Sequence, residues 1–130
     1  MKILFVDDHP DAWLAVILLE NKTGEKVLFA ADGKSALNIF KAQRDIDIVV
    51  TDGAMPVMNG AELAKAIYEM DPSVRIALVS SGIEEYQPLV EGVADCFDKL
   101  KFPVDNPLGP IIDWIKNNPK ESECRDSQTI

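Results

Sequence analysis

Short apolar runs and longer segments of helical period alternate along the chain. The runs rich in β-branched residues, which we expect to form strands, cover residues 2–6, 26–30, 47–51, 74–79 and 95–98. The segments whose apolar residues recur every three or four positions, which we expect to form helices, cover residues 10–21, 33–43, 60–69, 83–91 and 108–117. The third and fourth runs are apolar without alternation, which is typical of strands buried on both faces. The pattern therefore predicts a parallel sheet with helices on both sides, a three-layer α/β sandwich.

The length and composition fit one folded domain. A chain of 130 residues with 47% hydrophobic and 27% charged residues is large enough to bury a core and too apolar for disorder. We place this domain at residues 1–117. Because the segment 118–130 has no apolar period, we expect it to be a flexible C-terminal tail or the start of a linker.

Composition also narrows the location and the partners. The two cysteines, Cys96 and Cys124, lie far apart and outside any metal-binding or redox motif, which fits a reducing compartment. No stretch has the pattern of a signal segment or reaches membrane-spanning length. A net charge of −9 repels phosphate backbones. We therefore expect a cytoplasmic protein whose domain binds neither membranes nor nucleic acid, and which favours a cationic ligand or a basic partner surface.

Residues whose side chains can bind ligands or take part in reactions follow four of the five predicted strands. Asp7 and Asp8 follow the first strand, Asp52 ends the third, Ser80 follows the fourth and Lys99 the fifth. In open parallel sheets, ligands bind beyond the carboxyl ends of the strands. If the first and third strands are neighbours, the three carboxylates converge and need a cation to offset their repulsion. Such oxygen ligands suit a hard ion such as Mg²⁺, which also binds phosphate oxygens, so the pattern points toward phosphoryl chemistry.

Each of these residues also has an ordinary structural explanation. Asp7 or Asp8 could cap the first helix, Asp52 could form a turn, Ser80 could satisfy backbone groups, and Lys99 could be a solvated surface residue. Taken together, however, they form an acid pair, a lone acid, a hydroxyl and a cation at one edge of the sheet. The set favours a functional site over coincidence.

At this point the sequence resembles a known family. The stretch DGAMPVMNG at residues 52–60 is similar in every fixed position to the pattern D-x-x-M-P-x-M-x-G of response regulator receiver domains, which serve two-component signal transduction. The acid pair Asp7 and Asp8 resembles the pair that ends the family's first strand, and residues 92–99 resemble the approach to the family's lysine. The resemblance covers about residues 2–117. It implies the fold of chemotaxis regulators, a flavodoxin-like doubly wound five-stranded sheet of order 2-1-3-4-5.

The resemblance also implies roles for the residues at the strand ends. Asp52 would be the phosphoacceptor, which takes a phosphoryl group from a phosphohistidine on a sensor histidine kinase or a phosphotransfer protein. Ser80 would hydrogen-bond the phosphoryl group, and Lys99 would pair with Asp52 and then with the phosphate. The implied ligands of Mg²⁺, or of Mn²⁺, are Asp7, Asp8, Asp52 and the backbone carbonyl of Ala54. The domain would act as a conformational switch on a downstream protein target, with homodimerisation on phosphorylation as one route, and not as an enzyme beyond self-catalysed phosphotransfer and autodephosphorylation.

The sequence departs from the family's pattern after the fourth strand. The segment that leads to the fifth strand is short and contains Pro88, so we expect the fourth helix to begin late, near Pro88, or to be broken there. Cys96 stands where the family commonly has a mobile aromatic side chain, and we interpret it as a small buried hydrophobe. Lys99 lacks the proline that usually follows it. Lys101 stays a competitor for its role, because alternation along a strand points both side chains the same way.

Two other functions fit part of the pattern. A Mg²⁺-dependent phosphohydrolase of the haloacid dehalogenase type would also use Asp52 as its nucleophile, but it needs a second carboxylate where this chain has Ala54. A pseudo-receiver that only binds other proteins would explain Cys96 and the short fourth helix. The three acids at the strand ends argue against that alternative.

Overall fold

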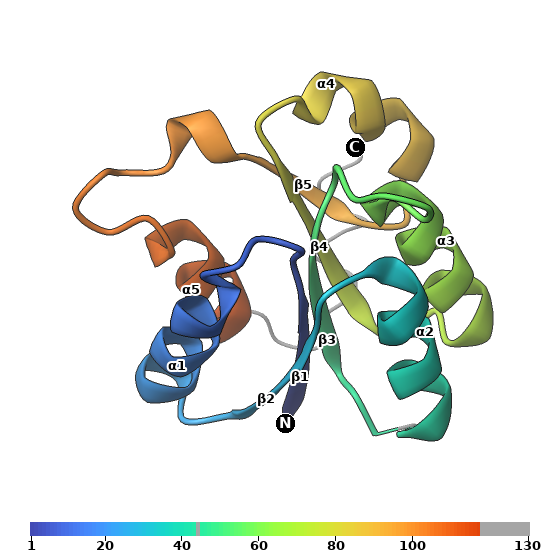
Figure 1. Cartoon of the computed structure of the whole chain (residues 1–130), viewed down its shortest axis with the longest axis horizontal. Coiled ribbons are helices and arrows are strands. Elements are labelled where there is room, and N and C mark those ends of the chain that lie inside the picture. The colour runs from blue at the N-terminus through green and yellow to red at the C-terminus, as the bar shows by residue number, and fades with distance from the viewer. Residues whose placement is uncertain (44, 118–130) are drawn as a thin grey trace.

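The computed structural model describes residues 1–43 and 45–117, and five parallel strands form its sheet (Figure 1). Their order is β2-β1-β3-β4-β5, as predicted. The strands are β1 (Lys2–Val6), β2 (Lys26–Ala30), β3 (Ile48–Asp52), β4 (Arg75–Ser80) and β5 (Asp95–Asp98). The third and fourth strands each begin and end one residue later than the sequence predicts.

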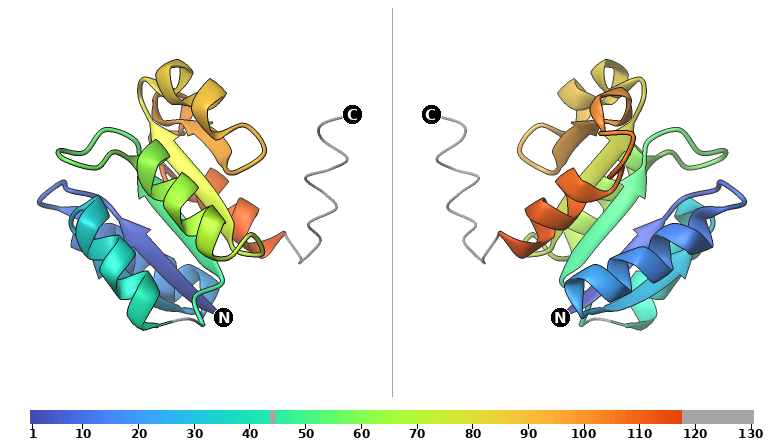
Figure 2. Two further views of the ribbon diagram at one scale, coloured as in Figure 1. Left: turned by 90° about the vertical axis from the view of Figure 1, so that its right-hand side faces the viewer. Right: turned by 90° about the vertical axis from the view of Figure 1, so that its left-hand side faces the viewer.

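Helices cover both faces of this sheet, which confirms the three-layer arrangement. Figure 2 shows α2 and α3 in front of the sheet in one view, and α1 and α5 in front of it in the other. The helices are α1 (Ala12–Thr23), α2 (Gly33–Ala42), α3 (Gly60–Met70), α4 (Ile83–Tyr86) and α5 (Gly109–Lys116). Two short 3₁₀ helices, η1 (Gln87–Val90) and η2 (Lys99–Lys101), flank β5.

The core consists of two clusters of buried side chains, one on each face of the sheet. Strand β1 shows the division, because its side chains alternate between the faces. Leu4 and Val6 belong to the cluster that packs under α2 and α3, while Ile3 and Phe5 belong to the cluster that packs under α1 and α5. A sheet buried on both sides explains why its strands are apolar without alternation.

The strand register brings the carboxyl ends of the strands to one edge of the sheet. Val6 pairs with Thr51, and Asp52 pairs with Val79. The loops that follow β1 and β3 therefore project side by side, as both views of Figure 2 show. This register places the residues after β1 next to the last residue of β3.

The fourth helix differs from the predicted span 83–91. Helix α4 is a single turn, and η1 follows it with Pro88 at its start. The expected break at Pro88 is therefore confirmed, because proline removes a backbone donor and disfavours a continuous α-helix. The alternative of a late start near Pro88 is wrong, since the helix begins at Ile83.

Two other predictions concern membrane-spanning segments and the C-terminal tail. Within residues 1–43 and 45–117, no helix has both the length and the apolar character that crossing a bilayer requires. The predicted tail at 118–130, which includes Cys124, lies outside the described residues.

Candidate functional site

The three predicted acids meet at the carboxyl edge of the sheet. One carboxylate oxygen from each of Asp7, Asp8 and Asp52 lies within 4.8 Å of the other two. Asp7 and Asp52 are half-buried and Asp8 is exposed. The Asp7 backbone N–H donates to the Ala30 carbonyl at 3.2 Å, and its carboxylate accepts from the His9 N–H at 3.0 Å. These bonds fix the turn after β1, so the acid pair is held by the backbone.

Lys99 reaches the same cluster from the end of β5. Its Nζ lies 3.4 Å from Asp52 Oδ1. The lysine opens η2, where Asp98 Oδ1 accepts from the Leu100 N–H at 3.0 Å. Because a 3₁₀ helix has three residues per turn, Lys99 and Lys101 do not point the same way. The strand alternation that left Lys101 as a competitor does not apply, and Lys99 is the lysine that lies against Asp52.

Ser80 ends β4, the strand next to the one that carries Asp52. It is buried, and its Oγ accepts from the Gly82 N–H at 3.1 Å. Gly53, the residue after Asp52, packs closely against Ser80. A Cβ at position 53 would lie 2.9 Å from Ser80 Cβ. The Gly53 N–H donates to both Val79 O and Asp52 Oδ1. The structure thus brings Ser80 beside the peptide that carries Asp52.

The loop from β3 to α3 folds back on the end of its own strand. Gly60 N–H donates to Gly53 O at 2.8 Å, and a Cβ on Gly60 would collide with the Asp52 carbonyl oxygen. Val57 has a φ of 69°, in the left-handed region that β-branched residues avoid, within a tight turn in which the Met58 N–H donates to Pro56 O. This closed loop fixes the backbone direction at Asp52.

Helix α3 starts at the end of that loop with a capping box. The Asn59 side chain accepts from the Glu62 N–H, and the Glu62 side chain accepts from the Asn59 N–H, both at 2.9 Å. Ala54 lies exposed in the loop, two residues after Asp52. The anchors at both ends of the loop hold its backbone close to the end of β3.

Burial and neighbouring charge act in opposite directions on Asp52. Loss of solvation raises the pKa of Asp52, the Lys99 ammonium lowers it, and the Asp7 carboxylate raises it again, with a net upward shift. A further cation beside Asp52 would stabilise the charged form of its carboxylate, which burial disfavours. The three acids offer only oxygen atoms, which fits a hard divalent ion such as Mg²⁺ and not a soft one.

The response regulator receiver domain family matches this chain over residues 3–101. The chain belongs to that family. It functions as a receiver domain of the kind found in two-component systems, and the predicted flavodoxin-like fold is the fold of this family.

Relatives of this receiver domain include proteins much longer than itself. It is 31% identical over 126 residues to the autoinducer 1 sensor kinase/phosphatase LuxN of Vibrio campbellii, a match that covers 94% of this chain and 14% of LuxN. It is 32% identical over 80 residues to sporulation initiation phosphotransferase F of Bacillus subtilis, covering 62% of this chain and 64% of that protein. The chain therefore spans less than two thirds of either relative.

Solved structures agree with this assignment. The chemotaxis protein CheY4 of Vibrio cholerae superposes with a TM-score of 0.70 at 27% identity, covering 85% of this chain and 94% of CheY4. CheY4 thus shares the fold described above.

Sequence reasoning missed one residue at the site, Tyr86. Its ring packs from α4 against the core cluster, and a Cβ on Gly53 would lie 3.0 Å from Tyr86 Cε2. A signal was available, because Tyr86 follows the buried Ile83 by three positions and shares its helix face. Cys96, in contrast, is half-buried against the same cluster, in partial agreement with the predicted small hydrophobe, and burial raises the pKa of its thiol.

Proposed function

We propose that Asp52 is the phosphoacceptor of this receiver domain. The donor is a phosphohistidine on a sensor histidine kinase or on a phosphotransfer protein. The single observation that carries the proposal is the convergence of three acids with one ammonium, because Asp7, Asp8 and Asp52 lie within 4.8 Å of each other and Lys99 lies 3.4 Å from Asp52. The names of two relatives, a sensor kinase/phosphatase and a phosphotransferase, support a phosphorelay setting.

The metal ligands in this proposal are the three carboxylates and the Ala54 carbonyl. Their oxygen atoms fit Mg²⁺, and Mn²⁺ has similar preferences. When bound, the ion supplies positive charge for the equatorial oxygens of the phosphoryl group. Asp7 and Asp8 also repel an incoming phosphate unless a cation offsets their charge, so the acid cluster makes phosphorylation depend on a divalent ion.

The protein groups then complete the transfer. An Asp52 carboxylate oxygen forms the new bond to phosphorus, the N–P bond of the phosphohistidine breaks, and the leaving imidazole takes up a proton. Because Lys99 Nζ lies 3.4 Å from Asp52 Oδ1, it can move its ammonium from the carboxylate to an oxygen of the phosphoryl group that Asp52 accepts. Ser80 keeps its O–H proton available for the phosphoryl group, because its Oγ accepts a hydrogen bond from Gly82.

The signalling role follows from the charge that phosphorylation adds, about −1.5 to −2 at neutral pH. We infer a conformational switch that acts on a downstream protein target, with a phosphorylation-dependent homodimer as one form of output. The domain carries out only its own phosphotransfer and autodephosphorylation in this proposal. The acidic chain, with net charge −9, argues against nucleic acid as a direct partner, and the free thiol of Cys96 supports a cytoplasmic location.

Intact mass spectrometry after incubation with Mg²⁺ and acetyl phosphate tests this function. We expect a single phosphoryl adduct in the natural protein, no adduct in Asp52→Ala, and an unchanged adduct in Asp113→Ala, whose carboxylate lies exposed on α5. EDTA should abolish the adduct. An adduct that survives Asp52→Ala would refute the assignment of the phosphoacceptor.

Two further outcomes would favour the other functions. Continuous release of phosphate from many esters without an accumulating adduct would indicate a phosphohydrolase with an aspartate nucleophile. No adduct with acetyl phosphate or with a phosphorylated histidine donor would indicate a pseudo-receiver that acts through protein contacts alone.

A further inference from the structure

An apolar cavity adjoins the candidate site on the face of the sheet that α1 and α5 cover. Its volume is about 170 Å³. Most of its wall is hydrocarbon, contributed by Phe5, Val50, Ala15, Phe102, Leu108 and Ile111. An engineered apolar cavity of about 150 Å³ in another protein stays dry and binds benzene, so a space of this size and lining accommodates one six-membered ring.

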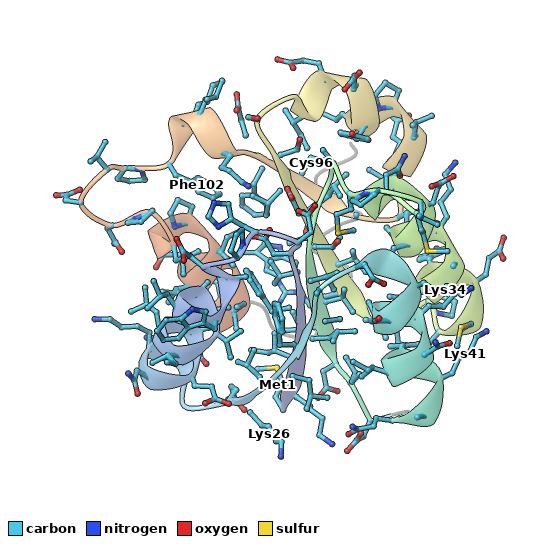
Figure 3. The ribbon with its side chains drawn as sticks, viewed as in Figure 1. Met1, Lys26, Lys34, Lys41, Cys96 and Phe102 are labelled. Carbon is cyan, nitrogen blue, oxygen red and sulfur yellow. The ribbon has the colours of Figure 1, made fainter. Side chains whose placement is uncertain are left out.

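The way α5 is attached explains why the space is open. Polar contacts lie at the far end of α5, where the Arg75 guanidinium lies 4.0 Å from the Trp114 ring centroid and Trp114 Nε1 donates to Asp95 at 2.8 Å. The helix does not begin until Gly109, and residues 102–108 cross from η2 to α5 as an extended loop (Figure 1). Phe102 lies on the α1 and α5 side of the sheet (Figure 3). The loop therefore covers the cavity with two half-buried side chains, Phe102 and Leu108, in place of a helical turn.

The charged groups of the cavity wall are confined to the candidate site. They are Asp7, Asp52 and Lys99, which together carry one net negative charge. The ammonium of Lys99 already pairs with Asp52 Oδ1, while Asp8 adds a further negative charge within 4.8 Å. A ligand whose apolar part fills the cavity therefore meets a negative potential at its other end.

We propose that this cavity binds a small organic amine, in which an aromatic or branched aliphatic group enters the cavity and a protonated amine lies against Asp7 and Asp52. Burial of the apolar group supplies most of the affinity. The charge complementarity selects an ammonium over a carboxylate of the same shape. The apolar group of the ligand would contact the wall formed by α1, the sheet and the loop. Its ammonium would contact the charged residues at the strand ends.

Such a ligand would regulate the domain by competing with the divalent ion. The ammonium and Mg²⁺ would share the carboxylates of Asp7 and Asp52, so each should weaken the binding of the other. This consequence for phosphorylation rests on the function proposed above. Binding of the amine itself does not, because it requires neither the ion nor a phosphoryl group.

Benzylamine and benzyl alcohol are suitable probes, because they have the same shape and differ in charge. Titration of the metal-free protein, followed by NMR chemical shifts, should show saturable binding of both, with benzylamine tighter by roughly two- to fivefold. Addition of Mg²⁺ should remove that advantage. The largest shifts should lie at Ala15, Leu108 and Ile111.

Two variants fill the cavity from opposite walls. Ala15→Leu, on α1, and Leu108→Trp, in the loop, should each weaken both probes by roughly tenfold or more, because they occupy the space that the ring needs. Ala42→Leu adds the same side chain at an exposed position of α2 and should leave binding unchanged. NMR peak dispersion checks that each variant is folded.

Three results would overturn the proposal: no saturable binding of either probe, binding that neither filled variant weakens, or equal affinities for the amine and the alcohol without Mg²⁺. Because no phosphodonor is present, these results leave the assignment of Asp52 as phosphoacceptor intact. A failed adduct with acetyl phosphate would likewise leave the binding of benzylamine intact.

Discussion

Replacing Asp52 with asparagine should stabilise the metal-free protein. The amide has the same shape, and its carbonyl oxygen can still accept the 3.0 Å hydrogen bond from the Gly53 N–H. The substitution removes repulsion from Asp7 and Asp8 at up to 4.8 Å and attraction to Lys99 at 3.4 Å. With an effective dielectric constant between about 20 and 80, the attraction at 3.4 Å amounts to roughly 1–5 kcal/mol and each repulsion at 4.8 Å to roughly 1–3.5 kcal/mol. Because solvent screens the exposed Asp8, these terms largely cancel. Relief of the desolvated charge, the largest cause of the raised pKa of Asp52, therefore supplies the gain in the free energy of unfolding, on the order of 1 kcal/mol.

The pH dependence has a definite sign. Because the pKa of Asp52 is raised above its ordinary value of 3.8, the folded state binds the proton more tightly than the unfolded state. The contribution of Asp52 to stability therefore falls as the pH rises from 3.8 through the raised pKa. The advantage of Asp52→Asn should be absent below that window and complete above it.

Urea unfolding in EDTA and in Mg²⁺, over a range of pH, measures both effects. An ion at 100 times its dissociation constant stabilises the natural protein by about 2.7 kcal/mol, and Asp52→Asn should lose most of that response. Asp113→Asn, at an exposed position of α5, serves as the control. The reasoning fails if Asp52→Asn lowers the free energy of unfolding in EDTA, or if Mg²⁺ stabilises the variant as much as the natural protein.

Three further substitutions test the geometry around the site. Lys99→Met should slow adduct formation with acetyl phosphate by roughly a hundredfold or more, since it removes the ammonium beside Asp52, whereas Lys101→Met should change the rate less than about twofold. Asn59→Ala should cost about 1 kcal/mol in urea unfolding through loss of the capping box, and Asn59→Ser should recover most of it. Gly60→Ala should lower the free energy of unfolding by more than about 2 kcal/mol, because its Cβ would collide with a backbone oxygen. Gly82→Ala should lower it by less than about 0.5 kcal/mol, because its Cβ would lie 3.7 Å from the Glu85 side chain. Equal effects within any of these pairs would contradict the contact on which it rests.

The sequence predicted the sheet and the acid cluster for one physical reason. Parallel strands buried on both faces give uninterrupted apolar runs, and a charge that ends such a run must lie at the carboxyl edge of the sheet. Asp7, Asp8 and Asp52 could therefore be placed at one edge, and the strand order implied by the family resemblance placed them side by side. The family resemblance assigned the role to Lys99, but residue spacing alone did not exclude Lys101, because that depends on whether the chain leaves β5 as a strand or as a 3₁₀ turn. That depends on the Asp98 cap, a local hydrogen bond that residue spacing does not encode.

The cavity could not be predicted either. Its walls come from residues that are far apart in the sequence, such as Phe5 on β1 and Leu108 before α5. Each of these residues is of a type that is common in protein cores. Whether such side chains meet or leave a space depends on where α5 begins and how the loop before it runs. Periodicity fixes which face of a helix is buried, but not the fit of one side chain against another.

The short α4 brings an aromatic side chain, Tyr86, to the core cluster that Cys96 also contacts. Cys96 and Tyr86 both pack against the same core cluster, and the Tyr86 ring reaches Gly53, the residue next to Asp52. A phosphoryl group on Asp52 would add its charge beside this contact. Because α4 is one turn that continues as a 3₁₀ helix, it has few regular backbone hydrogen bonds, and its rearrangement would break few of them. Amide hydrogen exchange in residues 83–90 should therefore change on phosphorylation, and Tyr86→Leu should reduce that change; unaltered exchange in this segment would exclude α4 as the element that responds.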